Sequence, residues 1–376
     1  MDNYSNTHIQ LIKVLPNYCV QYNEYVHSKS GQSLERSLSN LVDNSHKNKM
    51  SDKSIKRLFL ALDWLLLIAK KKTASNLKAN KEFQFKVSML TLTLPCEQLH
   101  SDLYVKKYLL NELLTVIRKK YNLHNYIWKA EKQGNGNIHF HIVIDKYIYY
   151  ADINRIWNKI LDTHGYIEQY RRNQEQLHKD GFKIKSYLNK IFSPSAQLAA
   201  YKKGVATNWK QPTGTTDIHS LKNIRNAKSY LAKYISKNPD KEKQIQFEVE
   251  KYKKSEKVSA VSTSVYNEIV EKVTKNLSIG GHIWFISQSL SKLKGIVIYI
   301  DYAISTELNW FRRKKKDGLI YTDFCTIFKM SLKDIFKFKL PKLSEKVQNY
   351  ITELRNVFYP DDEISYSPLG IPLNIF

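Results

Sequence analysis

The stretch Ile138-His-Phe-His-Ile-Val-Ile-Asp145 decides the fold at the centre of this chain, because two kinds of side chain alternate along it. Apolar residues occupy positions 138, 140, 142 and 144. Side chains of a β-strand have a period of two, so these four share one face, and His139 and His141 share the other. The stretch therefore predicts a strand with one apolar face and two imidazoles one pleat apart on the opposite face.

A second strand and a turn precede this stretch. Residues 126 to 131, Tyr-Ile-Trp-Lys-Ala-Glu, form a strand-like run, and residues 133 to 137 are a Gly- and Asn-rich loop. Such loops join antiparallel strands in hairpins. A hairpin that closes symmetrically pairs Lys132 with Ile138 and therefore Glu131 with His139, whose Cβ atoms then lie about 5 Å apart.

Glu131, His139 and His141 are thus predicted to form a compact three-ligand metal site. The His-x-His spacing alone is also compatible with a solvated strand face, and the opposed carboxylate favours the metal. Two imidazoles and one carboxylate suit Mg²⁺, Mn²⁺, Zn²⁺ or Fe²⁺, so the ligands do not specify the reaction.

A second motif, Tyr230-Leu-Ala-Lys-Tyr-Ile-Ser-Lys237, contains neither Gly nor Pro and predicts a helix. Tyr230, Lys233, Tyr234 and Lys237 then fall at i, i+3, i+4 and i+7, which places them on one stripe. Two tyrosines four residues apart usually reflect ordinary packing. The interleaved lysines are unusual for a core face and favour a stripe that faces phosphates.

Together the two motifs resemble the HUH endonuclease superfamily, specifically the two-tyrosine rolling-circle replication initiators of phages, plasmids and related elements. The strand-like run 85–95 is similar to the family's first motif, which ends in Thr-Leu-Thr. Asp217-Ile-His-Ser220 and the segment 281–287 also resemble bacterial initiators. The resemblance covers residues 83–290.

The resemblance implies an α+β fold in which a central antiparallel sheet is flanked by helices. We expect this HUH endonuclease domain at residues 83–300, a helical N-terminal extension at 1–82, and a basic, structurally mixed C-terminal region at 301–376. Helices are predicted at 101–120 and 151–163. Residues 166–219 read as a long basic connection.

The resemblance also implies a mechanism. Glu131, His139 and His141 would hold Mg²⁺ or Mn²⁺, Tyr230 and Tyr234 would attack DNA to form a 5′-phosphotyrosine, and Lys233 and Lys237 would assist them. Single-stranded DNA and origin DNA are the implied partners, together with a host DNA polymerase. No phosphate-binding loop of a helicase occurs in the sequence, so a host helicase would unwind the duplex.

The composition agrees with a polyanionic partner. Lys and Arg total 60 against 35 acidic residues, which gives a net charge of +25. A membrane partner is not expected, because no apolar run is long enough to span one, and the apolar run 58–69 contains Asp63 and reads as a buried helix. Three scattered cysteines suit a reducing compartment, here the cytoplasm of a bacterial host.

Four alternatives remain open. An HUH transposase would carry the same motifs. A mobilisation relaxase places its tyrosine before the histidines, where Tyr104-Val-Lys-Lys-Tyr108 offers a competing pair. A mononuclear iron oxygenase uses the same ligand types but explains neither the charge nor the Tyr/Lys stripe. A non-catalytic origin-binding protein would retain the metal site as a vestige.

Overall fold

The computed structural model describes residues 9–24, 50–70, 72–76, 81–186, 192–221, 241–314, 319–322, 325–337 and 340–359. The chain divides into two compact units. The large unit is built mainly from residues 71–287, and the small unit combines residues 56–70 and 288–363 with the N-terminal segment 1–46. Each unit is described separately below.

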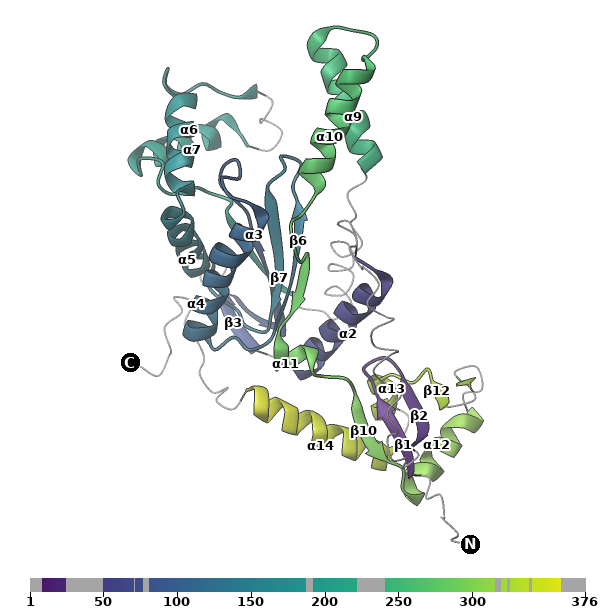
Figure 1. The fold of residues 1–376 in the computed structure, drawn as a ribbon. Coiled ribbons are helices and arrows are strands. Elements are labelled where there is room, and N and C mark those ends of the chain that lie inside the picture. Colours follow the sequence, from purple (N-terminus) through teal and green to yellow (C-terminus); the bar gives the residue numbers. More distant parts are fainter. Residues whose placement is uncertain are drawn as a thin grey trace, which may run out of the picture. The chain divides into compact units, whose positions relative to one another are not determined.

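A five-stranded antiparallel sheet forms the centre of the large unit (Figure 1). Its spatial order is β8 (Thr216–Leu221), β5 (Val87–Leu92), β7 (Ile138–Ile144), β6 (Tyr126–Lys132) and β9 (Trp284–Ile286). The hairpin β6–β7 closes in the predicted register. The prediction of an α+β fold with a central antiparallel sheet is confirmed.

One face of this sheet is covered by helices. These are α3 (Asp102–Tyr104), the π-helix η1 (Val105–Leu110), α4 (Asn111–Tyr121) and α5 (Tyr150–Thr163). The helices predicted at 101–120 and 151–163 are therefore confirmed. Every fourth residue from Val105 to Tyr121 is buried, so one continuous stripe packs on the sheet residues Leu90, Leu92, Phe140 and Ile142.

Strand β5 is buried on both faces from Val87 to Leu90. This explains why its apolar residues do not alternate in the sequence. It is preceded by a separate two-stranded sheet, β3 (Lys72–Asn76) with β4 (Lys81–Phe85), and Lys86 separates β4 from β5.

Two pairs of helices extend the large unit. The first pair, α6 (Tyr166–Leu177) and α7 (Pro194–Ala206), lies between α5 and β8 in the chain. The second pair, α9 (Lys241–Glu256) and α10 (Thr263–Leu277), forms a helical hairpin (Figure 1). The expected unstructured connection at 166–219 is thus wrong. Its helices escaped notice because α7 buries none of its side chains and so has no apolar stripe.

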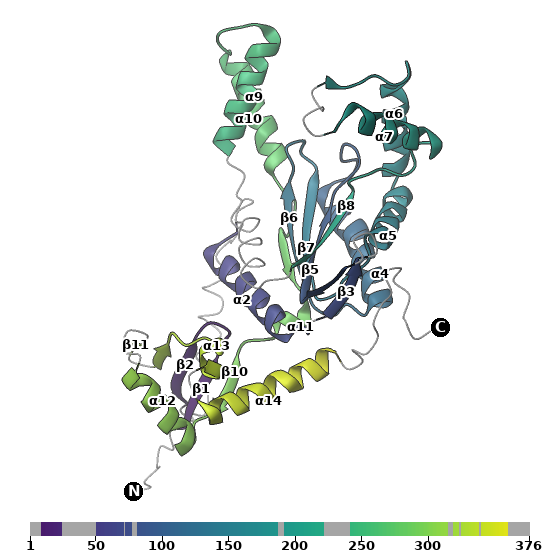
Figure 2. The same ribbon diagram turned by 180° about the vertical axis from the view of Figure 1, so that it is seen from behind.

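The small unit contains a second five-stranded antiparallel sheet (Figure 2). Its order is β10 (Ile296–Tyr299), β1 (Ile9–Val14), β2 (Cys19–Glu24), β12 (Cys325–Phe328) and β11 (Leu319–Tyr321). Segments from both ends of the chain therefore pair in one sheet. The mainly helical character expected for residues 1–82 did not include β1 and β2, whose neighbours β10 and β12 come from the C-terminal part of the chain.

Helices complete the small unit. They are α2 (Asp52–Ile68), α11 (Gln288–Ser291), α12 (Tyr302–Lys314), α13 (Leu332–Lys337) and α14 (Pro341–Phe358). The buried helix expected near 58–69 is confirmed as α2, whose Leu58, Leu62 and Leu65 are almost completely buried. Among the described residues, no helix combines the length and apolarity needed to cross a membrane.

Candidate metal centre

Glu131, His139 and His141 come together on the sheet face opposite the helices. Glu131 is directly paired with His139 across β6 and β7, and His141 follows one pleat further along. One ligand atom from each residue lies within 4.8 Å of the other two. The two imidazole rings have centroids 4.6 Å apart, and Nε2 of His141 lies 2.9 Å from Oε1 of Glu131.

The donor set and its burial fit a divalent cation. The side chain of Glu131 is 16% exposed, and His139 and His141 are buried. Burying a carboxylate is costly unless a positive charge or hydrogen bonds compensate it, and a cation between the three side chains would supply that charge. Small side-chain rotations would bring the three donors within about 2.0–2.2 Å of one ion.

Two threonines that sequence reasoning did not place at the site orient the imidazoles. Oγ1 of Thr91 lies 3.3 Å from Nδ1 of His141, and Oγ1 of Thr93 lies 3.0 Å from Nδ1 of His139. Because Nδ1 of each ring contacts a hydroxyl, Nε2 is the nitrogen left for a metal. Such outer contacts fix the tautomer and direction of metal-binding histidines. The two-residue spacing of Thr91 and Thr93 on a strand was the available signal, since it matches that of the histidines.

Other polar residues share this face. The cross-strand pairing places Asp217, Thr91, His141, Lys129 and Trp284 in one row across the five strands. Lys129 is buried directly opposite His141. A cation at that position adds positive potential where a phosphate would approach the metal ligands.

Asp217 and His219 form an exposed pair on the edge strand β8, with Oδ2 and Nε2 2.5 Å apart. Both side chains point to the same face as the metal ligands, because Asp217 is paired with Thr91 and His219 with Met89. They belong to the segment whose resemblance to initiators was noted in the sequence.

The predicted tyrosine helix lies outside the described residues. This applies to Tyr230, Lys233, Tyr234 and Lys237. Their assignment as nucleophiles and assisting cations therefore stays a prediction.

The competing pair, Tyr104 and Tyr108, is on the other side of the sheet. Tyr104 packs against the core cluster that contains Phe140 and Ile138, whose side chains point away from the metal ligands. Its hydroxyl lies 3.1 Å from Nδ1 of His164. The ring of Tyr108 is 4.6 Å from that of Tyr104. The sheet thus separates this pair from Glu131 and its partners.

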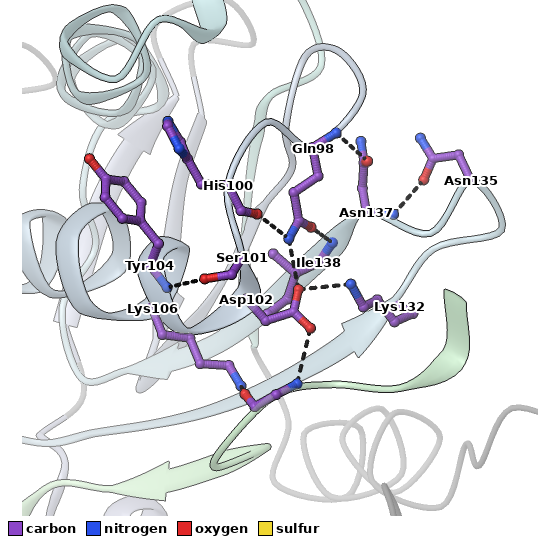
Figure 3. Close-up of polar contacts among 11 residues, drawn as sticks. Gln98, His100, Ser101, Asp102, Tyr104, Lys106, Lys132, Asn135, Asn137 and Ile138 are labelled. Carbon is purple, nitrogen blue, oxygen red and sulfur yellow. Dashed lines mark hydrogen bonds and ion pairs between the residues drawn. The ribbon is translucent and has the colours of Figure 1, made fainter. Parts of the chain in front are cut away.

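A polar network holds the turn end of the β6–β7 hairpin (Figure 3). Oδ1 of Asp102 accepts hydrogen bonds from Nζ of Lys132 and Nε2 of Gln98, each at 2.7 Å. Oε1 of Gln98 accepts from the backbone N–H of Ile138, also at 2.7 Å. Lys132 and Ile138 are the chain neighbours of Glu131 and His139. The network therefore fixes the backbone from which two of the ligands project.

The network also perturbs two pKa values. Burial alone would raise the pKa of Asp102, but hydrogen bonds from Gln98 and Lys132 outweigh it and hold the pKa below its usual value. Burial lowers the pKa of Lys106 to about 8, although nearby Asp102 opposes this shift. Nζ of Lys106 donates to the carbonyl oxygen of Gly280 at 2.6 Å, and Oδ2 of Asp102 accepts from the N–H of Gly280 at 3.1 Å. The network thus also fixes the segment that leads into β9.

Comparison with known proteins gave one match. No curated protein and no solved structure matches the chain. Residues 87–239 match a family of replication-associated proteins of the ORF2 type. The matched range begins at β5, contains the three metal-ligand candidates, and ends two residues after Lys237. This match supports the identification of the chain as a replication initiator protein.

Proposed function

We propose that this chain initiates rolling-circle replication by nicking and rejoining single-stranded DNA at an origin. The observation that carries the proposal is the largely buried Glu131–His139–His141 cluster within residues that match a replication-associated family. The net charge of +25 supports a DNA partner.

Glu131, His139 and His141 would hold Mg²⁺ or Mn²⁺. When bound, such an ion polarises the scissile phosphate and offsets the negative charge that develops on it. Thr91 and Thr93 keep the two imidazoles aimed at the cation, and Lys129 contributes further positive charge beside it.

The nucleophile would be a tyrosine of the 230–237 segment. Oη of Tyr230 or Tyr234 attacks the phosphorus, the phosphorus–O3′ bond breaks, and the departing 3′ oxygen takes up a proton. Lys233 or Lys237 favours the phenolate, since a nearby positive charge lowers the pKa of a phenol. The products are a 5′-phosphotyrosine and a free 3′-OH. Because the phosphotyrosine conserves the bond energy, rejoining requires no nucleotide cofactor.

The partners follow from these products. The 3′-OH is a primer for a host DNA polymerase, and unwinding falls to a host helicase in the cytoplasm of a bacterial host. A second tyrosine would allow a second cleavage after one round of synthesis and so release a circle. The relaxase alternative loses its nucleophile, because Tyr104 and Tyr108 lie on the sheet face opposite the candidate metal ligands.

The decisive test is formation of a covalent adduct. The chain is incubated with single-stranded oligonucleotides and Mn²⁺, and the linked peptide is identified by mass spectrometry. We expect DNA on Tyr230 or Tyr234, none with Tyr230→Phe/Tyr234→Phe, and none with His139→Ala/His141→Ala. Phenylalanine removes the nucleophile with almost no change in volume, so the double variant should still bind DNA and metal.

Three results would contradict the proposal. Full cleavage by the His139→Ala/His141→Ala variant would exclude the metal centre. DNA attached to Tyr104 or Tyr108 would mean the wrong nucleophile. Origin binding without any adduct would favour the non-catalytic alternative.

A further inference from the structure

We propose that the α6–α7 arm, the described residues 166–186 and 192–210, is a binding surface for the phosphates of duplex DNA next to the cleaved strand. This inference rests on the proposed function and adds a place for the duplex that flanks a nick. It is carried by where the arm is anchored, by its folded core, and by its uncompensated charge.

Both ends of the arm are anchored beside the metal centre. At the beginning, the backbone oxygen of Tyr166 accepts a hydrogen bond from Sγ of Cys96 at 3.6 Å. Beyond its end, the backbone oxygen of Thr215 accepts from the N–H of Thr93 at 2.8 Å. Thr93 is the residue whose hydroxyl contacts His139. DNA held by the arm would therefore lie near the edge of the sheet that bears the metal ligands.

The arm has its own small aromatic core, so it is a folded element. The rings of His178 and Trp209 stack in parallel with centroids 5.1 Å apart, and Tyr201 contacts both. Gly204 makes this packing possible, because a Cβ at that position would lie 1.9 Å from the ring of Trp209. Nε2 and Oε1 of Gln197 bind the backbone of Lys185, which ties α7 to the preceding segment.

The outer surface of the arm carries positive charge that nothing in the described part of the chain neutralises. All three acidic residues, Glu168, Glu175 and Asp180, are already paired with Arg171, Arg172 or Lys183. Four exposed lysines have no ion pair among the described residues: Lys179, Lys202, Lys203 and Lys210. Uncompensated lysines that protrude from one surface are typical of phosphate contact.

The other helical pair does not share this property. Helices α9 and α10 together carry seven lysines against six glutamates. Their charges nearly cancel, so they attract DNA less than the α6–α7 arm.

The shape and chemistry of the arm favour a duplex over a single strand. Single strands are held largely by stacking of bases on exposed aromatic rings. Here Trp209 is buried and the rings of His178 and Tyr201 are used within the arm. Helix α7, in contrast, is free along most of its circumference, and an α-helix fits the major groove of B-DNA. Contacts from its lysines to phosphates would hold the duplex without reading its sequence.

The test compares two variants of equal charge. The arm variant is Lys202→Gln/Lys203→Gln/Lys210→Gln, and the control is Lys251→Gln/Lys254→Gln/Lys257→Gln, which removes three exposed lysines from α9 and the turn after it. Affinity for a mixed-sequence DNA duplex and for an oligothymidine of equal length is measured by fluorescence anisotropy over a range of salt concentrations. Circular dichroism checks that both variants are folded.

We expect the arm variant to lose about tenfold or more in duplex affinity near 0.1 M salt. The slope of log K against log salt should become shallower by up to about 2.7, because each phosphate contact contributes about 0.9. The control variant should bind the duplex like the unmodified chain, and oligothymidine binding should change less than duplex binding in the arm variant.

Unchanged duplex affinity in the arm variant, an equal loss in the control, or an equal loss on oligothymidine would each overturn the assignment. The measurement involves no cleavage. Failure of nicking would therefore refute the proposed function without affecting this result, and a chain that forms the covalent adduct but has an unchanged arm variant would refute the arm alone.

Discussion

Replacing Thr93 with valine should weaken metal binding without unfolding the chain. The substitution keeps the branched shape of the side chain and removes the hydroxyl that lies 3.0 Å from Nδ1 of His139. The ring of His139 then loses the contact that orients its Nε2 towards the cation. Loss of such an outer contact typically costs about tenfold to a hundredfold in metal affinity, which corresponds to about 1.4 to 2.7 kcal/mol.

The matching change at Thr91 should have a smaller effect, because its hydroxyl lies 3.3 Å from Nδ1 of His141, and His141 has a second contact to Glu131 at 2.9 Å. Mn²⁺ affinity is measured by isothermal titration calorimetry. Nicking is measured as a function of Mn²⁺ concentration. A residue that positions a ligand should raise the Mn²⁺ concentration needed for half-maximal cleavage, and excess Mn²⁺ should restore most of the rate.

Ser88→Ala is the control on the same strand. The Ser88 hydroxyl is buried and has no hydrogen-bond partner among the described residues. Its side chain points to the helix-covered face, so its removal should leave Mn²⁺ affinity unchanged. Native Mn²⁺ affinity in a folded Thr93→Val variant would refute the orienting role of the threonines.

Two further predictions concern the network and the arm. Because the pKa of Lys106 is about 8 in the folded chain and the usual value is 10.5, the unfolded chain binds more protons between these pH values, so the free energy of unfolding should rise with pH across this window. Urea unfolding at several pH values should show a smaller rise for Lys106→Met, and an identical rise in both proteins would contradict the assignment to Lys106. Gly204→Ala should destabilise the α6–α7 arm by about 1–3 kcal/mol through overpacking against Trp209, seen as faster proteolytic cleavage within the arm. Gly134→Ala, where an added Cβ meets nothing within 4 Å, is the control, and equal protection of both variants would argue against the aromatic core.

The choice between the two tyrosine pairs shows how far sequence reasoning reaches. Both segments spell Tyr-x-x-Lys-Tyr, so composition and helical spacing do not separate them. Motif order favoured Tyr230 and Tyr234 through a resemblance. The pairing of β6 with β7 adds a physical reason, because it places the side chains that pack against Tyr104 on one face and Glu131 and His139 on the other.

The metal centre was predictable from sequence because it is local. Both strands and their turn lie within residues 126–144, so alternation and a short loop are enough to set which residues face each other. The helices at 102–121 and 150–163 were predictable for a similar reason, since each buries one stripe on the sheet. Helix α7 was missed because it packs through a few aromatic contacts of the arm and has no apolar stripe.

By itself the sequence determined the β6–β7 hairpin, its register, and the candidate ligands Glu131, His139 and His141. Only the tertiary structure brought Thr93 to His139, across 46 residues, and Asp102 to Lys132, across 30. It also decided that β1 pairs with β10 in one sheet. The physical reason is that periodicity reports which face of an element is buried. It does not report which distant element covers that face, because this depends on the complementary shape and hydrogen-bonding groups of segments far apart in the chain.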